Sequence, residues 1–216
     1  GLRERLAHLG LVQGFDELLC ENQVTGIEPL PHQVETVRKV LRQFHGRVLL
    51  ADEVGLGKTI EACMVLKEYA LRGMAERASI AAARRREHAE PFAAQTSDVV
   101  VVEEAHHLKD RNSQSWKLVD ALNKRFLLLL SATPVQNDLV ELYNLLTLLK
   151  PGIFKTPKDF RAVHVTPGKP RVPANPDALR ALMRDAMIRN TRAIVALKLP
   201  RRQASTLKIE PSAGER

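Results

Sequence analysis

The chain has little of several residue types that define whole classes of protein. Only two of its 216 residues are cysteines, Cys20 and Cys63, and they lie far apart without ligand-spaced partners. Neither a zinc site nor a disulfide framework is therefore supported, and a reducing cytosol fits best. Aromatic residues make up 4% of the chain, which argues against a surface that stacks unpaired bases on a row of rings. No apolar run approaches the ~20 residues that span a bilayer, so we expect no membrane partner.

What the chain does contain is typical of a globular protein with a polyanionic partner. Hydrophobic residues make up 44% of it, enough for one large domain or two small ones. Lys and Arg number 33 against 25 for Asp and Glu, which gives a net charge of +8. This balance favours nucleic acid, although simple solubility also explains it. The chain starts at Gly1 and its first ten residues lack a signal-peptide core, so we expect an excised fragment without a secretion signal.

The most informative stretch is a glycine-rich turn, ADEVGLGKT, that follows an apolar run. Gly55 and Gly57 allow the backbone to curl until several N–H groups face inward, and the next helix adds its positive end. Lys58 supplies a charge for the β- and γ-phosphates of a nucleotide, and Thr59 supplies a hydroxyl for Mg²⁺. Asp52 stands where the G-x-x-x-x-G-K-[ST] pattern has its first glycine, so a surface turn that caps a helix is the alternative. We expect the whole loop to line the nucleotide site, namely Asp52, Glu53, Val54, Gly55, Leu56, Gly57, Lys58 and Thr59.

Predicted strands and helices alternate along the chain. Apolar runs predict buried strands at 48–51, 99–102 and 126–130. Apolar residues at helical spacing predict helices at 32–44, 59–71, 113–124, 138–150 and 176–189, after a helical preamble at 1–28. Residues 151–176 are rich in proline and basic residues and are expected to be extended. The alternation predicts an α/β protein with a parallel β-sheet and helices on both faces, whose ligands collect at the carboxyl ends of the strands.

A phosphate loop needs an acidic partner on a neighbouring strand, and Glu103 and Glu104 end the second predicted strand. We assign Glu103 to the metal and Glu104 to orienting or deprotonating the attacking water, while the metal and Lys58 absorb the charge that develops on the phosphates. A solvated strand end or a helix cap is the alternative interpretation of two adjacent acids.

Further polar residues fall near the same strand ends. His106 is placed to carry a hydrogen bond from the acids towards Ser131 or Thr133, and Ser131, Ala132 and Thr133 offer small side chains that suit sensing of the γ-phosphate. A turn before the following proline would also explain that triplet. Gln33 can both donate and accept a hydrogen bond, which suits reading of an adenine edge, although an exposed helix glutamine is the simpler interpretation.

In order, these segments resemble the motifs of the superfamily two helicase-like ATPases, and most closely those of the Swi/Snf branch. The matching segments are LPHQ at 30–33, DEVGLGKT at 52–59, EEAH at 103–106 and SATPVQN at 131–137. The resemblance implies a RecA-like P-loop lobe that binds ATP with Mg²⁺ and acts on double-stranded DNA. It is similar to bacterial members, one of which recycles RNA polymerase, so RNA polymerase is a further expected partner. The implied location is the bacterial cytoplasm or nucleoid.

The resemblance also divides the chain. It implies a preamble at 1–28, a first RecA-like lobe at 29–198 and a linker at 199–216 towards a second lobe that is missing here. The chain departs from the family in having Glu103 in place of an aspartate and in lacking a unit of roughly 30 residues or more near Arg77, where motif Ia is expected. The family carries its arginine fingers on the second lobe, so the isolated lobe is expected to hydrolyse ATP feebly.

These inferences lead to one expected function and several rivals. The expected function is the ATP-binding lobe of a DNA-dependent ATPase that couples hydrolysis to movement along duplex DNA or its remodelling. An RNA helicase or a restriction-enzyme motor lobe uses the same chemistry, and a catalytically weakened nucleic-acid-binding module belongs to a different class. A P-loop kinase or GTPase needs base-reading or acceptor motifs that the sequence lacks. The runs at 84–86 and 169–171 are candidate phosphate contacts, although solvated charge explains them equally well.

Overall fold

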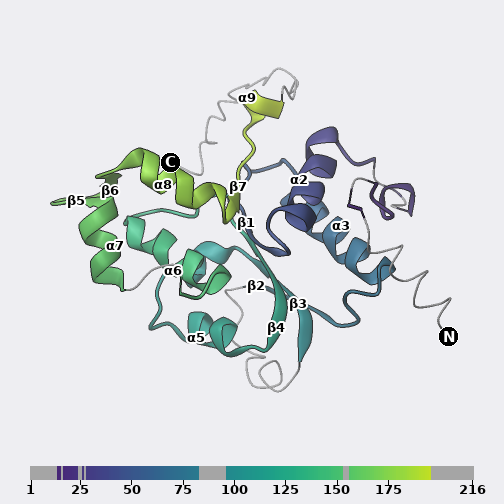
Figure 1. The fold of residues 1–216 in the computed structure, drawn as a ribbon, viewed down its shortest axis with the longest axis horizontal. Helices are drawn as coiled ribbons and strands as arrows, with labels where there is room; N and C mark the ends of the chain where they lie inside the picture. Colours follow the sequence, from purple (N-terminus) through teal and green to yellow (C-terminus); the bar gives the residue numbers. More distant parts are fainter. Residues whose placement is uncertain are drawn as a thin grey trace, which may run out of the picture.

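A five-stranded parallel sheet forms the centre of the computed structural model (Figure 1). The strands lie in the order β2-β3-β4-β1-β7, with the bounds Arg47–Leu50 for β1, Ala78–Ala82 for β2, Ser97–Glu103 for β3, Lys124–Leu130 for β4 and Met187–Ile188 for β7. Leu50 pairs with Leu130, and Val102 pairs with Leu129, so three neighbouring strands end together at one edge. The predicted parallel α/β sheet is confirmed.

The structure describes residues 14–15, 17–23, 26, 28–82, 96–152 and 156–195. The expected linker at 199–216, the arginines at 84–86 and most of the expected preamble lie outside these residues. Within them, every helix is too short or too polar to cross a membrane.

Helices cover both faces of the sheet, as the sequence predicts (Figure 1). Side chains on a strand alternate between its two faces. Val48 and Leu50 of β1 therefore join a cluster with α2 and α3, while Leu49 between them joins the opposite cluster with α5 and α6. The helices concerned are α2 at Pro31–Arg42, α3 at Lys58–Leu71, α5 at Gln114–Ala121 and α6 at Leu139–Leu149.

Side-chain caps set the starts of the helices on one face. The Ser113 hydroxyl accepts a hydrogen bond from the Trp116 amide at the start of α5, and Asp138 accepts one from the Val140 amide at the start of α6. The helix predicted at 138–150 is thus confirmed, with Asp138 as its N-cap. The predicted helix at 113–124 was too long, because Lys124 already begins β4.

The expected extended segment at 151–176 was wrong. It contains α7 at Pro157–His164, which Thr156 caps by accepting from the Asp159 amide, and then the antiparallel pair β5 (Val165–Thr166) and β6 (Lys169–Pro173). Phe160 and His164, one helical turn apart, are buried and face the core. Pro157, one of the prolines that suggested an extended chain, instead occupies the first turn of α7, where proline is tolerated.

The helix predicted at 176–189 was also too long. The structure has α8 at Pro176–Arg184, after which the chain enters the sheet as β7 beside β1 and continues to α9 at Arg192–Val195. A strand of two residues carries too little pattern to be found from sequence.

The helical preamble is not confirmed where residues 14–23 are described. Phe15 and Leu18 lie in irregular chain, and a short 3-10 helix, η1, follows at Glu21–Gln23. Two side chains at the end of α3 hold this segment: Glu68 in the last turn accepts from the Cys20 amide at 2.9 Å, and the C-cap residue Arg72 donates to the Glu17 carbonyl at 2.9 Å. The apolar residues that suggested a helix therefore pack without one.

Candidate active site

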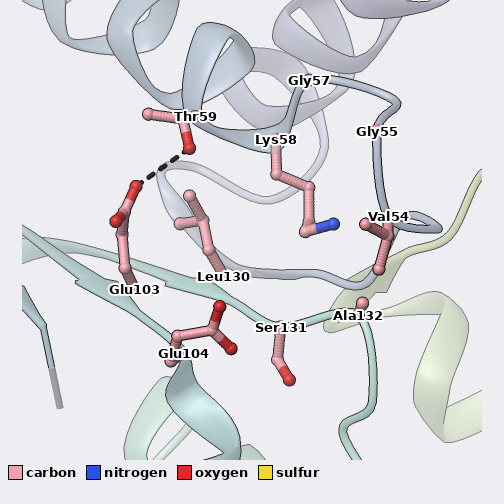
Figure 2. Close-up of a pocket in the computed structure, with 10 residues that line it drawn as sticks. All are labelled: Val54, Gly55, Gly57, Lys58, Thr59, Glu103, Glu104, Leu130, Ser131 and Ala132. Carbon is pink, nitrogen blue, oxygen red and sulfur yellow. Dashed lines mark hydrogen bonds between the residues drawn. The ribbon is translucent and has the colours of Figure 1, made fainter. Parts of the chain in front are cut away.

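A pocket of about 300 Å³ opens at the carboxyl edge of the sheet (Figure 2). Its walls come from the loop after β1, the end of β3 and the end of β4. The lining residues are Val54, Gly55, Gly57, Lys58, Thr59, Glu103, Glu104, Leu130, Ser131 and Ala132. All but Leu130 were predicted as site residues, so folding brings three separate motifs to one pocket.

The loop after β1 has a backbone that depends on glycine. Gly55 and Gly57 have φ angles of +87° and +91°, a backbone region that residues with a Cβ rarely adopt. Gly57 caps α3, and the described residues contribute no side-chain cap there. The first N–H groups of this 14-residue helix therefore remain available to an anion, and the helix dipole adds to the attraction.

Lys58 points into the space that the loop encloses (Figure 2). Its ammonium donates to the Asp52 carbonyl at 2.8 Å and to the Glu53 carbonyl at 3.3 Å. Both partners are neutral oxygens, so a phosphate placed at the helix N-terminus would be a stronger acceptor for the same ammonium. The side chain is thus held where an incoming triphosphate can reach it.

Thr59 and Glu103 meet across the pocket (Figure 2). The Thr59 hydroxyl donates to Glu103 Oε1 at 2.9 Å, although 44 residues separate the two in sequence. A hydroxyl and a carboxylate are hard oxygen ligands of the kind that Mg²⁺ binds together with phosphate oxygens and water. The residues at this point of the pocket therefore fit a magnesium ion.

Glu104 has a backbone conformation that is uncommon for a residue with a Cβ, with φ +52° and ψ +44°. Its Oε2 lies 3.2 Å from His106 Nδ1, and the same nitrogen lies 3.4 Å from the Ser131 hydroxyl. Ser131 in turn accepts from the Thr133 amide at 3.3 Å. His106 thus lies between the acid and the 131–133 segment, where the sequence analysis placed it.

Gln33 lies behind the loop and outside the pocket. Its Oε1 accepts from the Leu30 amide and its Nε2 donates to the Leu56 carbonyl, each at 2.9 Å, and the residue is 2% exposed. A ring nitrogen of His32 lies 3.0 Å from the same Leu56 carbonyl. Gln33 therefore braces the loop in this structure, and its reading of adenine stays a prediction.

Asp52, Glu53 and Leu56 of the loop were also predicted to line the site, and none of them is among the residues that line the pocket. The carboxylate of Asp52 is fully buried and accepts two hydrogen bonds from Asn190, while Glu53 accepts one from the Arg192 amide. Neither Asn190 nor Arg192 was predicted as a site residue. The one available signal was the acidic residue in place of the first glycine of the loop pattern, because a buried carboxylate needs donors.

Next to Asp52 lies a second buried acid, Glu61 of α3. Burial, and then the negative charge of Asp52, raise the pKa of Glu61 to about 9. Glu61 is therefore a neutral carboxylic acid at pH 7.

Comparison with known proteins agrees with these motifs. Residues 78–216 match the family model of the SNF2-related domain. "Uncharacterized ATP-dependent helicase YqhH" of Bacillus subtilis is 32% identical over 242 aligned residues, which cover 93% of this chain and 43% of the relative. "RNA polymerase-associated protein RapA" of Pseudomonas savastanoi pv. phaseolicola is 32% identical over 190 residues, covering 62% of this chain and 20% of the relative. The chain thus spans less than half the length of these relatives.

Solved structures give the same fold. The Sulfolobus solfataricus SWI2/SNF2 ATPase core in complex with dsDNA has a TM-score of 0.65 and 17% identity, over 82% of this chain and 47% of that one. The SWI2/SNF2 ATPase core domain of the same organism has a TM-score of 0.64 and 19% identity, over 85% and 48%. At such identities the likeness concerns the RecA-like fold. Because the family model covers more than half of the chain, the chain belongs to the SNF2-related domain family.

Proposed function

We propose that this chain is the ATP-binding lobe of a DNA-dependent ATPase that couples hydrolysis to translocation along duplex DNA or to its remodelling. The observation that carries the proposal is the convergence of Lys58, Thr59 and Glu103 on one pocket at the N-terminus of α3. The names of its relatives, an ATP-dependent helicase and a SWI2/SNF2 ATPase core bound to dsDNA, support the same activity.

The pocket residues divide the work of phosphoryl transfer. The loop N–H groups and the Lys58 ammonium bind the triphosphate. Thr59 and Glu103 would hold Mg²⁺, and an ion bound there would offset negative charge on the phosphates. Glu104 orients the attacking water and accepts its proton. His106 and Ser131 connect Glu104 to the segment that ends at Thr133, so a change at the phosphates can reach that segment.

The whole activity requires more than this chain. It covers 47% of the SWI2/SNF2 core, which supports a second RecA-like lobe in the working protein. Translocation requires two lobes that open and close with the nucleotide state. An arginine finger is worth about 10³ to 10⁵ in rate in other phosphoryl-transfer proteins, and we propose that the second lobe supplies one here. RNA polymerase is a proposed partner in view of the name of RapA, and the bacterial cytoplasm or nucleoid is the proposed location.

The unit missing near Arg77 belongs to the same proposal. Since 93% of 216 residues is about 201, about 41 of the 242 positions aligned with YqhH have no residue in this chain. This supports a lobe that is shorter than the matching part of YqhH, and we propose that the difference lies near Arg77, where motif Ia is expected.

The proposal is tested by ATP hydrolysis of the two-lobed protein, measured with and without duplex DNA beside Lys58→Ala. We expect hydrolysis that duplex DNA stimulates and that the variant loses. Stimulation by RNA alone would favour the RNA helicase alternative. Nucleotide binding without stimulated hydrolysis would favour the catalytically weakened nucleic-acid-binding module. Absence of nucleotide binding would reject the DNA-dependent ATPase, the RNA helicase and the weakened ATP-binding module alike.

A further inference from the structure

The residue that breaks the phosphate-loop pattern, Asp52, is buried and held by several hydrogen bonds. Asp52 is 0% exposed, and both of its carboxylate oxygens accept hydrogen bonds from one residue, Asn190. The Asn190 amide donates to Oδ1 at 2.7 Å, and the Asn190 side chain donates to Oδ2 at 2.9 Å. A carboxylate taken out of water is costly unless such donors are provided, so the pair forms a specific connection between positions 138 residues apart.

Asn190 also reaches the helix that braces the other side of the loop. Its side-chain nitrogen donates a second hydrogen bond to the Thr36 hydroxyl of α2 at 3.0 Å. The same helix carries Gln33, which holds the Leu56 carbonyl. The Asn190 side chain therefore connects Asp52, at the start of the loop, to α2, the helix whose Gln33 holds the later loop residue Leu56.

The chain after Asn190 continues along the loop. The Glu53 amide donates to the Asn190 carbonyl at 3.1 Å, and the Arg192 amide donates to Glu53 Oε2 at 3.1 Å. The Arg192 guanidinium then donates to the Val54 carbonyl at 2.6 Å. Residues 190–192, which we call the strap, thus contact three consecutive loop residues.

A loop with two glycines at positive φ has many conformations to lose when it closes around a phosphate. Contacts that hold the loop in the bound shape beforehand remove part of that cost from binding. Glycine at position 52, as in the strict pattern, offers no side chain for this purpose. We propose that Asp52 and Asn190 are positioning residues, which hold the phosphate loop in its nucleotide-binding shape through the strap. The inference rests on the proposed function in that the ligand of the loop is a nucleoside triphosphate.

The test is titration of the protein with a fluorescent ATP analogue and Mg²⁺, each variant being measured the same interval below its own melting temperature. We expect Asn190→Ala to weaken binding by on the order of tenfold, since it removes hydrogen bonds to a buried charge. Asn112→Ala, at an exposed asparagine outside the strap, is the matched control and should bind as the wild type does.

A double variant separates positioning from a general loss of structure. In Asp52→Asn with Asn190→Asp, the new amide at position 52 still accepts from the backbone amide of residue 190 and donates to the new carboxylate there, which accepts from Thr36. We expect affinity within about threefold of wild type. Equal affinity of Asn190→Ala and wild type would overturn the proposal, and so would a double variant that folds but binds as weakly as Asn190→Ala.

Hydrogen exchange without nucleotide distinguishes this proposal from the proposed function. The Glu53 amide donates to the Asn190 carbonyl, and the Arg192 amide donates to the Glu53 carboxylate. If the strap holds the loop, Asn190→Ala should speed hydrogen exchange of both amides. If the variant exchanges faster but the wild type binds no ATP analogue, the positioning role of the strap stands and the proposed function is rejected. Unchanged exchange at both amides would reject the strap.

Discussion

The two walls of the pocket are held in different ways. On the loop wall, Asp52 and Leu56 are buried, and their hydrogen bonds to Asn190 and Gln33 are 2.7–2.9 Å long. On the acid wall, the Glu104 side chain is 66% exposed, and it connects to His106 and then to Ser131 over 3.2 Å and 3.4 Å. The first wall is anchored in the core, while on the second wall longer contacts link the exposed Glu104 carboxylate to the buried Ser131.

This difference matches two tasks. A rigid loop wall lowers the cost of binding the phosphates, because its shape exists before the ligand arrives. A looser acid wall can rearrange with the state of the γ-phosphate, and the left-handed backbone of Glu104 is a strained point of the kind often found at switches. We therefore expect changes to the loop wall to alter affinity and changes to the acid wall to alter turnover.

The largest effect is expected at Glu104. Glu104→Gln removes the base but keeps the size of the side chain, so ATP hydrolysis by the two-lobed protein should fall by about 10² to 10⁴. Affinity for ATP should stay within about twofold, since the residue lies opposite the loop. Steady-state hydrolysis and an equilibrium titration measure the two quantities, with Glu35→Gln on an exposed part of α2 as control. A large loss of affinity would remove the distinction between the walls.

The next effect is expected at Lys58. Lys58→Ala removes the one charged side chain that the loop directs at the phosphates, so affinity for ATP should fall by about 10- to 100-fold. Isothermal titration in the presence of Mg²⁺ measures the change. Lys117→Ala, at an exposed lysine of α5, should leave affinity unchanged. Equal losses in both variants would mean that overall charge, and not the loop, governs binding.

A smaller effect is expected at Ser131. Ser131→Ala breaks the connection between His106 and the 131–133 segment, so hydrolysis should fall several-fold while affinity for ATP is retained. The change is checked by comparing kcat and Kd in one preparation. If Kd for ATP rises and kcat does not change, Ser131 contributes to nucleotide binding, as the loop wall does, and not to turnover.

The smallest effect concerns His164, which lies in α7 away from both walls. Burial lowers the pKa of His164 below its usual 6.5. The unfolded state then binds more protons than the folded state between the two pKa values, so stability present above pH 6.5 is lost as the pH falls through the lowered value, at up to about 1.4 kcal/mol per pH unit. Urea unfolding at pH 5.5 and 7.5 should show this loss in the wild type and a smaller one in His164→Gln. An equal loss in both would assign it to another group.

The sequence predicted the parts of the site that depend on local chemistry. Each of these parts can be recognised from a few neighbouring residues: the glycines at 55 and 57, the adjacent Lys58 and Thr59, and the acids at a strand end. The contact of Asp52 with Asn190 was not predicted, because its partners are 138 residues apart and no pattern in the sequence connects them. The fold followed a similar rule. Strands with long runs of large apolar residues were found, while β2, which is mostly alanine, and β7, which has two residues, were missed.

A crystal structure of the protein with Mg²⁺ and a non-hydrolysable ATP analogue tests the central claim most directly. We predict phosphates at the N-terminus of α3, with the Lys58 ammonium moved from the Asp52 and Glu53 carbonyls to a phosphate oxygen. The contacts of Gln33 with Leu56 and of Asn190 with Asp52 should be unchanged, while Glu104 and Ser131 shift. Phosphates bound elsewhere, or a loop that rearranges while the acid wall stays fixed, would contradict the division of the pocket into a rigid binding wall and an adjustable catalytic wall.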